Sequence, residues 1–279
     1  MPLLPVNGYD IFYADDDFVD PWIPHETVFM QPWLLGNHTR FRAWVPAFAG
    51  EYRVIRMDRR GLGRSGAPTA DFEFALDPLL DDFTAVLDAL GIDAVHYVGE
   101  STGGMFGIAF AAKHPQRVKS LVLCATPTSL TATAAGFTVD GYVDGPTAVM
   151  TMGSRRYADT LALRASVAAQ DPMEIRERWE HVARMPPDTI ASIIGMVTDA
   201  RFDVTSLLPA IRAPTLLLTP GASEVLAGDD QPAIRGLIPR CEEVIFENAA
   251  HTIFFDHRDE CIDAARNFVR RHTATAGRS

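Results

Sequence analysis

The clearest chemical signal in the chain is a run of five residues, Gly99-Glu100-Ser101-Thr102-Gly103. They follow the apolar run AVHYV, which is typical of a buried strand, and they open the segment TGGMFGIAFAAK, which is typical of a helix. A strand that turns directly into a helix strains the central residue, and small neighbours give the backbone room to bend. The central hydroxyl then stands clear at the edge of the sheet. We therefore predict that Ser101 is a nucleophile, with an ordinary tight turn as the alternative.

A serine hydroxyl needs a base within hydrogen-bond distance before it becomes a good nucleophile. His251 is the candidate, because it follows the predicted strand VIFENAA and lies late in the chain, after the serine. His257 stands in a polar stretch six residues further on, and we expect it to face solvent. The helix after Ser101 directs backbone N–H groups at developing negative charge, so the Thr102 N–H would be the first oxyanion donor.

The elements that must position these residues alternate between strand and helix. Parallel neighbouring strands require crossover connections, which helices supply. The segment from 128 to 200 breaks this rhythm, because two helical patterns at 154–170 and 172–185 follow each other with no strand between them. We predict an α/β fold with a mostly parallel, doubly wound sheet, built from residues 1–127 and 201–279 and carrying a helical cap at 128–200. The expected strands lie at 25–33, 52–58, 94–100, 118–126, 214–221 and 241–251, and the expected core helices at 78–90, 102–114, 232–238 and 260–271.

Five segments match, in order, the landmarks of one superfamily: DRRGLGRSGAP, GESTGGM, HPQRVKSLVL, IRAPTLLLTPG and NAAHTIFFD. Over nearly its whole length the chain resembles the α/β-hydrolase superfamily, and within it the capped esterases and lactonases with a serine nucleophile. The resemblance implies a third triad member, an acid placed shortly after the strand that precedes the histidine strand. Glu224, three residues after Gly221, fits that place. Asp229 and Asp230 remain alternatives, although they stand where carboxylates cap a predicted helix.

A second part of the resemblance concerns the oxyanion hole. Relatives that this chain resembles carry His-Gly and then a residue whose backbone N–H completes the hole, whereas this chain has Gln31-Pro32-Trp33. Proline has no N–H to donate, but the donor comes after it, so the resemblance implies the N–H of Trp33. The indole of Trp33 either lines the substrate site or packs in the core.

Three arginines crowd the turn DRRGLGRSG: Arg59, Arg60 and Arg64. Such a cluster could bind an anion. Similar turns in the superfamily instead position backbone beside the active-site strand. We therefore expect a structural role for these arginines.

Bulk composition argues against several classes of protein. A net charge of -11 argues against a nucleic acid as the partner, because phosphate backbones are bound through clustered Lys and Arg. The cysteines, Cys124, Cys241 and Cys261, show neither CxxC nor metal-site spacing, so we expect no disulfide framework and no metal. Neither a signal peptide nor a membrane-spanning apolar run is evident, which favours a cytoplasmic protein. A monomer and a homodimer are both open.

Together these features predict a serine hydrolase that cleaves an ester, lactone or enol-lactone bond in a small, partly apolar organic substrate, with no metal or organic cofactor. One alternative is a hydrolase that uses the same triad to cleave a C–C bond in a ring-cleavage diketone. The other is a noncatalytic ligand receptor that keeps the pocket of a hydrolase. Turnover distinguishes the receptor from the two enzymes.

Overall fold

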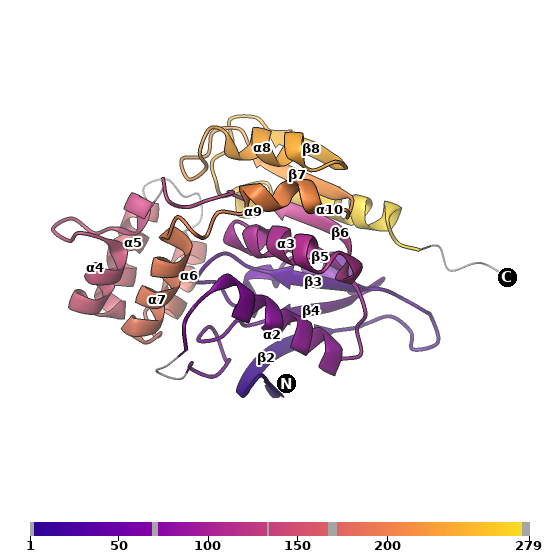
Figure 1. Cartoon of the computed structure of the whole chain (residues 1–279), viewed down its shortest axis with the longest axis horizontal. Coiled ribbons are helices and arrows are strands. Elements are labelled where there is room, and N and C mark those ends of the chain that lie inside the picture. Colours follow the sequence, from indigo (N-terminus) through magenta and orange to yellow (C-terminus); the bar gives the residue numbers. More distant parts are fainter. Residues whose placement is uncertain (1–2, 69–71, 133, 167–171, 275–279) are drawn as a thin grey trace.

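The computed structural model describes residues 3–68, 72–132, 134–166 and 172–274. Their strands form one eight-stranded sheet in the order β1-β2-β4-β3-β5-β6-β7-β8. At one edge the pairs β1–β2 and β2–β4 are antiparallel, and the pairs from β4 to β8 are parallel. Figure 1 shows helices packed along this sheet. The predicted fold class, a mostly parallel α/β sheet, is confirmed. The strands are β1 (Leu3–Val6), β2 (Tyr9–Asp16), β3 (Thr27–Gln31), β4 (Arg53–Met57), β5 (Val95–Glu100), β6 (Val118–Cys124), β7 (Thr215–Pro220) and β8 (Cys241–Phe246).

The central strands are buried at nearly every position, as expected for parallel strands covered by helices on both faces. β5 is buried from end to end, and its last residue, Glu100, leads directly into Ser101. The carboxyl ends of β3, β5 and β7 share one edge of the sheet because these strands run in the same direction. Residues that follow these strands are therefore brought together.

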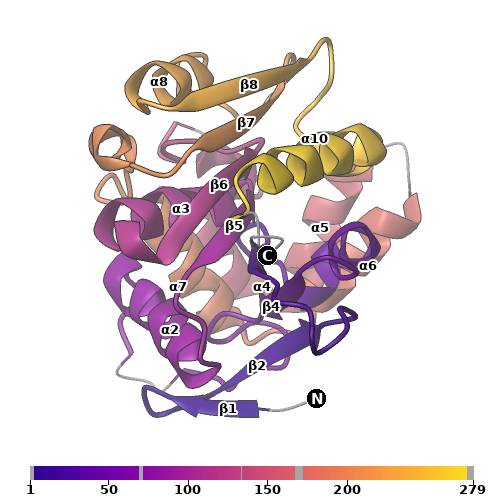
Figure 2. The same cartoon turned by 90° about the vertical axis from the view of Figure 1, so that its right-hand side faces the viewer.

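Helices cover both faces of the sheet, with α2 and α3 on one side and α10 on the other (Figure 2). On the first side, Phe83 of α2 packs edge-on against Phe106 and Phe110 of α3. On the second side, Phe268 of α10 and Phe48 of α1 belong to one apolar cluster. The core helices are α1 (Val45–Phe48), α2 (Leu76–Ala89), α3 (Thr102–Lys113), α8 (Asp230–Leu237), α9 (Ile253–Asp256) and α10 (Arg258–Arg271), and short 3-10 turns cover His38–Phe41, Pro115–Arg117, Ala134–Phe137 and Thr205–Ala210.

Four helices lie between β6 and β7 and form a separate layer at one end of the sheet, at the left of Figure 1. We call this layer the helical insertion: α4 (Gly145–Met152), α5 (Ser154–Ser166), α6 (Pro172–Val182) and α7 (Pro187–Thr198). α4 packs on α7, and α5 packs on α6. The helix expected at 154–170 is present up to residue 166, and residues 167–170 lie outside the described part of the chain.

None of the helices in the described ranges is both long enough and apolar enough to cross a membrane.

Candidate active site

The turn between β5 and α3 holds Ser101 in an uncommon backbone conformation. Its φ of 52° and ψ of -121° lie in a region that L-residues rarely adopt, which costs about 1–3 kcal/mol. Two features hold the turn: the Ser101 N–H donates to the carbonyl of Cys124 at 2.8 Å, and a Cβ on Gly99 would come within 2.6 Å of the backbone of Gly103. The strained strand-turn-helix predicted from the sequence is therefore present.

His251 reaches Ser101 from the other side of the site. It follows β8 and immediately precedes the short helix α9, 150 residues along the chain from the serine. Its Nε2 lies 3.2 Å from Ser101 Oγ, which is hydrogen-bond distance. The structure thus brings together the two residues that the sequence analysis singled out as nucleophile and base.

Burial lowers the pKa of His251 to about 4. The nearby carboxylates of Glu100 and Glu224 oppose this shift, while the guanidinium groups of Arg178 and Arg40 add to it. An imidazole with such a pKa is neutral near pH 7, so one of its two ring nitrogens can accept a proton, and the tautomer decides which one. The environment of His251 suits a general base.

The partner of His251 Nδ1 is Ser223 Oγ, at 3.1 Å. Glu224, the predicted acid, is the next residue, but its side chain is exposed, and no hydrogen bond joins it to His251 in the described chain. Its carboxylate is near enough to act on His251 through its charge. The structure therefore places Glu224 beside the histidine without giving it the contact that the sequence predicted.

The two rival acids lie at the start of α8, and Asp230 is engaged there in other contacts. Asp230 is buried at the start of α8, where its carboxylate accepts hydrogen bonds from the N–H and hydroxyl of Thr128, at 2.8 and 2.6 Å, and from the Ala227 N–H at 2.7 Å. Asp229 occupies the N-cap position of the same helix. Both residues stand at the start of α8, as the sequence suggested, but Asp229 makes no side-chain capping hydrogen bond within the described residues, and the donors to Asp230 lie outside the helix. The contacts of Asp230 tie the chain after β6 to the core.

Both predicted oxyanion donors flank the serine turn. Thr102 is the first residue of α3, and Trp33 follows β3 after Pro32. Neither backbone N–H donates to another group within the described residues. The Trp33 ring is partly buried and packs edge-on against Trp179 of α6, with ring centroids 5.7 Å apart. Trp33 therefore connects the strand-end loop to the helical insertion.

An ion pair beside the nucleophile was not predicted from the sequence. Glu100 is buried and accepts hydrogen bonds from Arg40, whose Nε lies 2.8 Å from Oε2. The Arg40 guanidinium also lies 3.8 Å from the ring centre of Phe255, which follows His251 by four residues. Arg40 and Glu100 are 60 residues apart, so only the fold reveals their pairing.

The insertion contributes a second arginine near the site. The guanidinium of Arg178, on α6, lies 5.7 Å from the ring centre of Trp33 and 5.8 Å from that of Phe255. A cation at this distance is attracted by the face of an aromatic ring.

As for metals, the described residues contain no group of three or more His, Cys, Asp or Glu side chains arranged to hold one.

Comparison with known proteins supports this architecture. A family model described as the alpha/beta hydrolase fold matches residues 27–150. An N-formylmaleamate deformylase of Pseudomonas putida is 28% identical over 218 residues, covering 77% of each chain. A protein of Variovorax paradoxus assigned as a carbamate hydrolase is 31% identical over 193 residues, covering 66% of this chain and 69% of its own.

Solved structures agree in fold. The enol-lactonase of Burkholderia xenovorans LB400 superposes with a TM-score of 0.83 at 21% identity, covering 96% of this chain and 100% of the other. At this identity the superposition establishes the fold alone. Taken with the sequence relatives, it shows that this chain belongs to the α/β-hydrolase family.

Proposed function

We propose that the chain is a serine hydrolase that cleaves an ester, lactone or enol-lactone bond in a small, partly apolar organic substrate. The observation that carries the proposal is the 3.2 Å contact between Ser101 Oγ and His251 Nε2 at a strained strand-helix turn. The low pKa of His251 supports it, because the base is neutral when it must accept a proton.

In this mechanism Ser101 Oγ attacks the carbonyl carbon while His251 Nε2 takes the hydroxyl proton. The N–H groups of Thr102 and Trp33 stabilise the oxyanion of the tetrahedral intermediate. The intermediate collapses to an acyl-enzyme as His251 returns the proton to the leaving alkoxide. A water molecule, deprotonated by His251, then releases the acid and regenerates Ser101.

Glu224 is the proposed acid of the triad. Its charge already favours the protonated form of His251, which is the form that develops in the transition state. The Ser223 hydroxyl holds Nδ1 in this structure, and Glu224 is its immediate neighbour in the chain. A change in the orientation of the Glu224 side chain would let its carboxylate accept a hydrogen bond from His251 Nδ1.

The side chains near the catalytic pair favour a substrate with both apolar and anionic parts. Trp33 follows β3, Phe255 stands four residues after His251, and Trp179 of the insertion packs on Trp33, so these rings supply aromatic surface around the strand ends. Arg178 adds a positive charge over two of these rings. A compound with a carboxylate near its scissile bond would match this combination better than a purely aliphatic ester.

The first test is covalent labelling with a fluorophosphonate probe, followed by peptide mapping. We expect Ser101 to be labelled in the native chain, Ser101→Ala to take up no label, and His251→Ala to react far more slowly. His257→Ala is the matched control, because that side chain lies half-exposed near Glu260 and His251 is the histidine that contacts Ser101, so labelling should be unchanged. A native chain that does not label would count against an activated serine and favour the noncatalytic receptor.

A panel of substrates then tests which type of bond the enzyme cleaves. We expect turnover of p-nitrophenyl esters and simple lactones, with higher kcat/KM for versions that carry a carboxylate. A vinylogous diketone reports on C–C bond hydrolysis. If that compound alone turns over, the C–C bond hydrolase replaces the proposal.

A further inference from the structure

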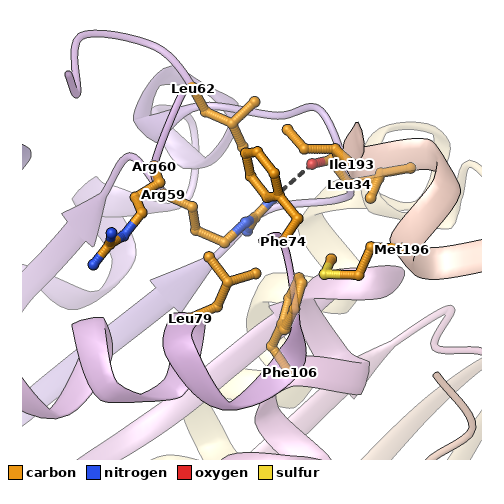
Figure 3. A pocket seen from close by; sticks show the side chains of 9 residues that line it. All are labelled: Leu34, Arg59, Arg60, Leu62, Phe74, Leu79, Phe106, Ile193 and Met196. Atoms are coloured by element: carbon orange, nitrogen blue, oxygen red, sulfur yellow. Dashed lines mark hydrogen bonds between the residues drawn. The ribbon is translucent and has the colours of Figure 1, made fainter. Parts of the chain in front are cut away.

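Arg59 is a buried cation whose hydrogen bonds all go to neutral groups. It lies in the turn after β4 and is 3% exposed. Its Nη1 donates to the side-chain oxygen of Gln31 and to the carbonyl of Pro32, at 3.2 and 3.0 Å, and its Nη2 donates to the carbonyls of Trp33 and Leu34, at 2.7 and 2.9 Å. Figure 3 shows the side chain reaching toward Leu34.

The neighbouring arginine behaves differently. Arg60 is equally buried, but it forms an ion pair with Asp82, at 2.5 and 2.6 Å. A buried charge normally requires such a partner. Arg59 is instead compensated by three consecutive backbone carbonyls, and all of them belong to the loop that carries the predicted oxyanion donor.

The geometry of the peptide bond links these carbonyls to that donor. The Pro32 carbonyl and the Trp33 N–H belong to one peptide unit, and no peptide bond in the described chain is cis. In a trans peptide the C=O and N–H point in opposite directions within one plane. A hydrogen bond that fixes the Pro32 carbonyl on Arg59 therefore also fixes the direction of the Trp33 N–H on the opposite side.

The loop lies directly against the start of α3. A Cβ on Gly103 would collide with the carbonyl oxygens of Gln31 and Pro32, the second at 2.6 Å. Only a glycine permits this approach. The peptide held by Arg59 is thus in contact with the turn that carries Ser101 and Thr102, where an oxyanion donor is needed.

We propose that Arg59 is a positioning residue for the oxyanion hole: by binding the carbonyls of Pro32, Trp33 and Leu34 it holds the Trp33 N–H in its catalytic orientation. This inference rests on the proposed function. Donors that are oriented before the reaction need no reorganisation when charge develops on the substrate, which is the main source of their effect on rate. Proline at position 32 provides no N–H of its own, so the loop depends on outside contacts to set its peptide planes.

The cavity next to Arg59 does not offer a competing role. It is lined by Arg59, Arg60 and apolar side chains such as Phe106, and its volume is about 10 Å³ (Figure 3). Such a space holds about one water molecule. Burial lowers the pKa of Arg59 to about 10, so the guanidinium remains charged near neutral pH.

The test compares Arg59→Lys and Arg59→Met with Arg60→Lys as the matched control, because the two arginines are adjacent and equally buried. Lysine keeps the charge at position 59 but presents its donors from a single nitrogen, so it does not reproduce the two-nitrogen fork that spans the three carbonyls. The measurements are kcat, KM, the thermal unfolding midpoint and the inhibition constant of an aryl boronic acid, which forms a tetrahedral anionic adduct on a catalytic serine. The affinity for the product acid serves as the ground-state reference.

We expect both Arg59 variants to lose about 10²-fold in kcat and in boronic acid affinity, a size typical of a displaced oxyanion donor. KM and product affinity should change by less than about threefold, because the ground state gains little from the hole. Arg60→Lys should lower the unfolding midpoint and leave kcat and boronic acid affinity unchanged.

Two other results would overturn the inference in distinguishable ways. Arg59 variants that unfold at lower temperature but keep kcat and boronic acid affinity would show that Arg59 only stabilises the loop. A native chain that binds no boronic acid and labels with no fluorophosphonate would overturn the proposed function, and the role of Arg59 with it.

Discussion

The acid limb of the pH profile is the most direct test of the electrostatics around His251. Burial lowers the pKa of this imidazole to about 4 from an ordinary value of 6.5. The neutral ring is the active form, since a protonated Nε2 cannot accept the Ser101 proton. The rate should therefore stay level as the pH falls through 6.5 and should decline only as the pH approaches 4.

The difference is large enough to measure at one pH. At pH 5 a histidine with a pKa of about 4 is about 90% neutral, whereas one with a pKa of about 6.5 is about 3% neutral. The assay is the rate of Ser101 labelling by a fluorophosphonate from pH 3.5 to 8, with circular dichroism at each pH to verify that the chain is folded. A labelling rate that halves near pH 6.5 or above would refute the reasoning.

A charge variant tests the cause of the shift. Arg178 lowers the pKa of His251, so Arg178→Ala should move the acid limb to higher pH. Arg176→Ala, on the same helix, is the matched control, because this exposed arginine does not contribute to the shift. An acid limb that stays in place in Arg178→Ala would show that the insertion does not influence the base.

The remaining predictions concern the triad acid and two buried carboxylate clusters. Glu224→Gln should lower kcat by about 10³- to 10⁴-fold, as loss of the triad carboxylate does in serine proteases, whereas Ser223→Ala should cost about tenfold or less; the reverse order would identify Ser223 as the main orienting group. Asp230→Ala should destabilise the fold by about 3 kcal/mol in urea unfolding, because buried backbone and hydroxyl donors lose a charged acceptor, while Ser101 labelling of the folded variant persists. Arg40→Met should cost about 3–5 kcal/mol of unfolding free energy, because it leaves the Glu100 carboxylate buried without its cation.

Each stability prediction has a matched control. Asp229→Ala removes an exposed carboxylate at the same helix start and should cost about 1 kcal/mol or less. Arg53→Met breaks the more exposed pair with Asp15 and should cost about 0–1 kcal/mol. If the controls lose as much stability as their buried counterparts, burial is not the cause.

The meeting of Ser101 and His251 could be predicted from the sequence because both signals are local. Ser101 stands where an apolar strand meets a glycine-rich helix start, and His251 follows another strand. Parallel strands place their carboxyl ends at one edge of the sheet, so two strand ends far apart in sequence meet without any further information. The position of Ser101 after β5 and of His251 after β8 was enough to predict that the two side chains meet.

Contacts made by loops could not be predicted in the same way. The hydrogen bonds of Arg59 and of Arg40 depend on side-chain directions in turns, where no periodic pattern applies. The antiparallel strands β1 and β2 were also missed. β1 is largely exposed. The apolar run of β2 covers only residues 11–14 and has acidic residues on both sides, Asp10 before it and Asp15 after it, so it is shorter than the runs that marked the central strands.

The geometry at Nδ1 is the reason why the proposed mechanism calls for a carboxylate, although a hydroxyl occupies the position. A histidine that accepts a proton at Nε2 carries its own hydrogen on Nδ1, and that hydrogen needs an acceptor. Ser223 Oγ already accepts from the N–H groups of Val225 and Leu226, each at 3.2 Å. A hydroxyl has two acceptor positions and one hydrogen.

When Ser223 accepts from both of these N–H groups, its hydroxyl can only donate to Nδ1, and the tautomer that fits this arrangement carries its ring hydrogen on Nε2. The proposed mechanism needs the other tautomer, with the hydrogen on Nδ1, and therefore needs an acceptor other than Ser223 at that nitrogen. A carboxylate has no such conflict, because it only accepts and because its charge stabilises the imidazolium. Glu224 is the adjacent residue on the same turn and already acts on His251 through its charge. The turn after β7 therefore decides which tautomer of His251 faces Ser101, and the comparison of Ser223→Ala with Glu224→Gln measures that choice.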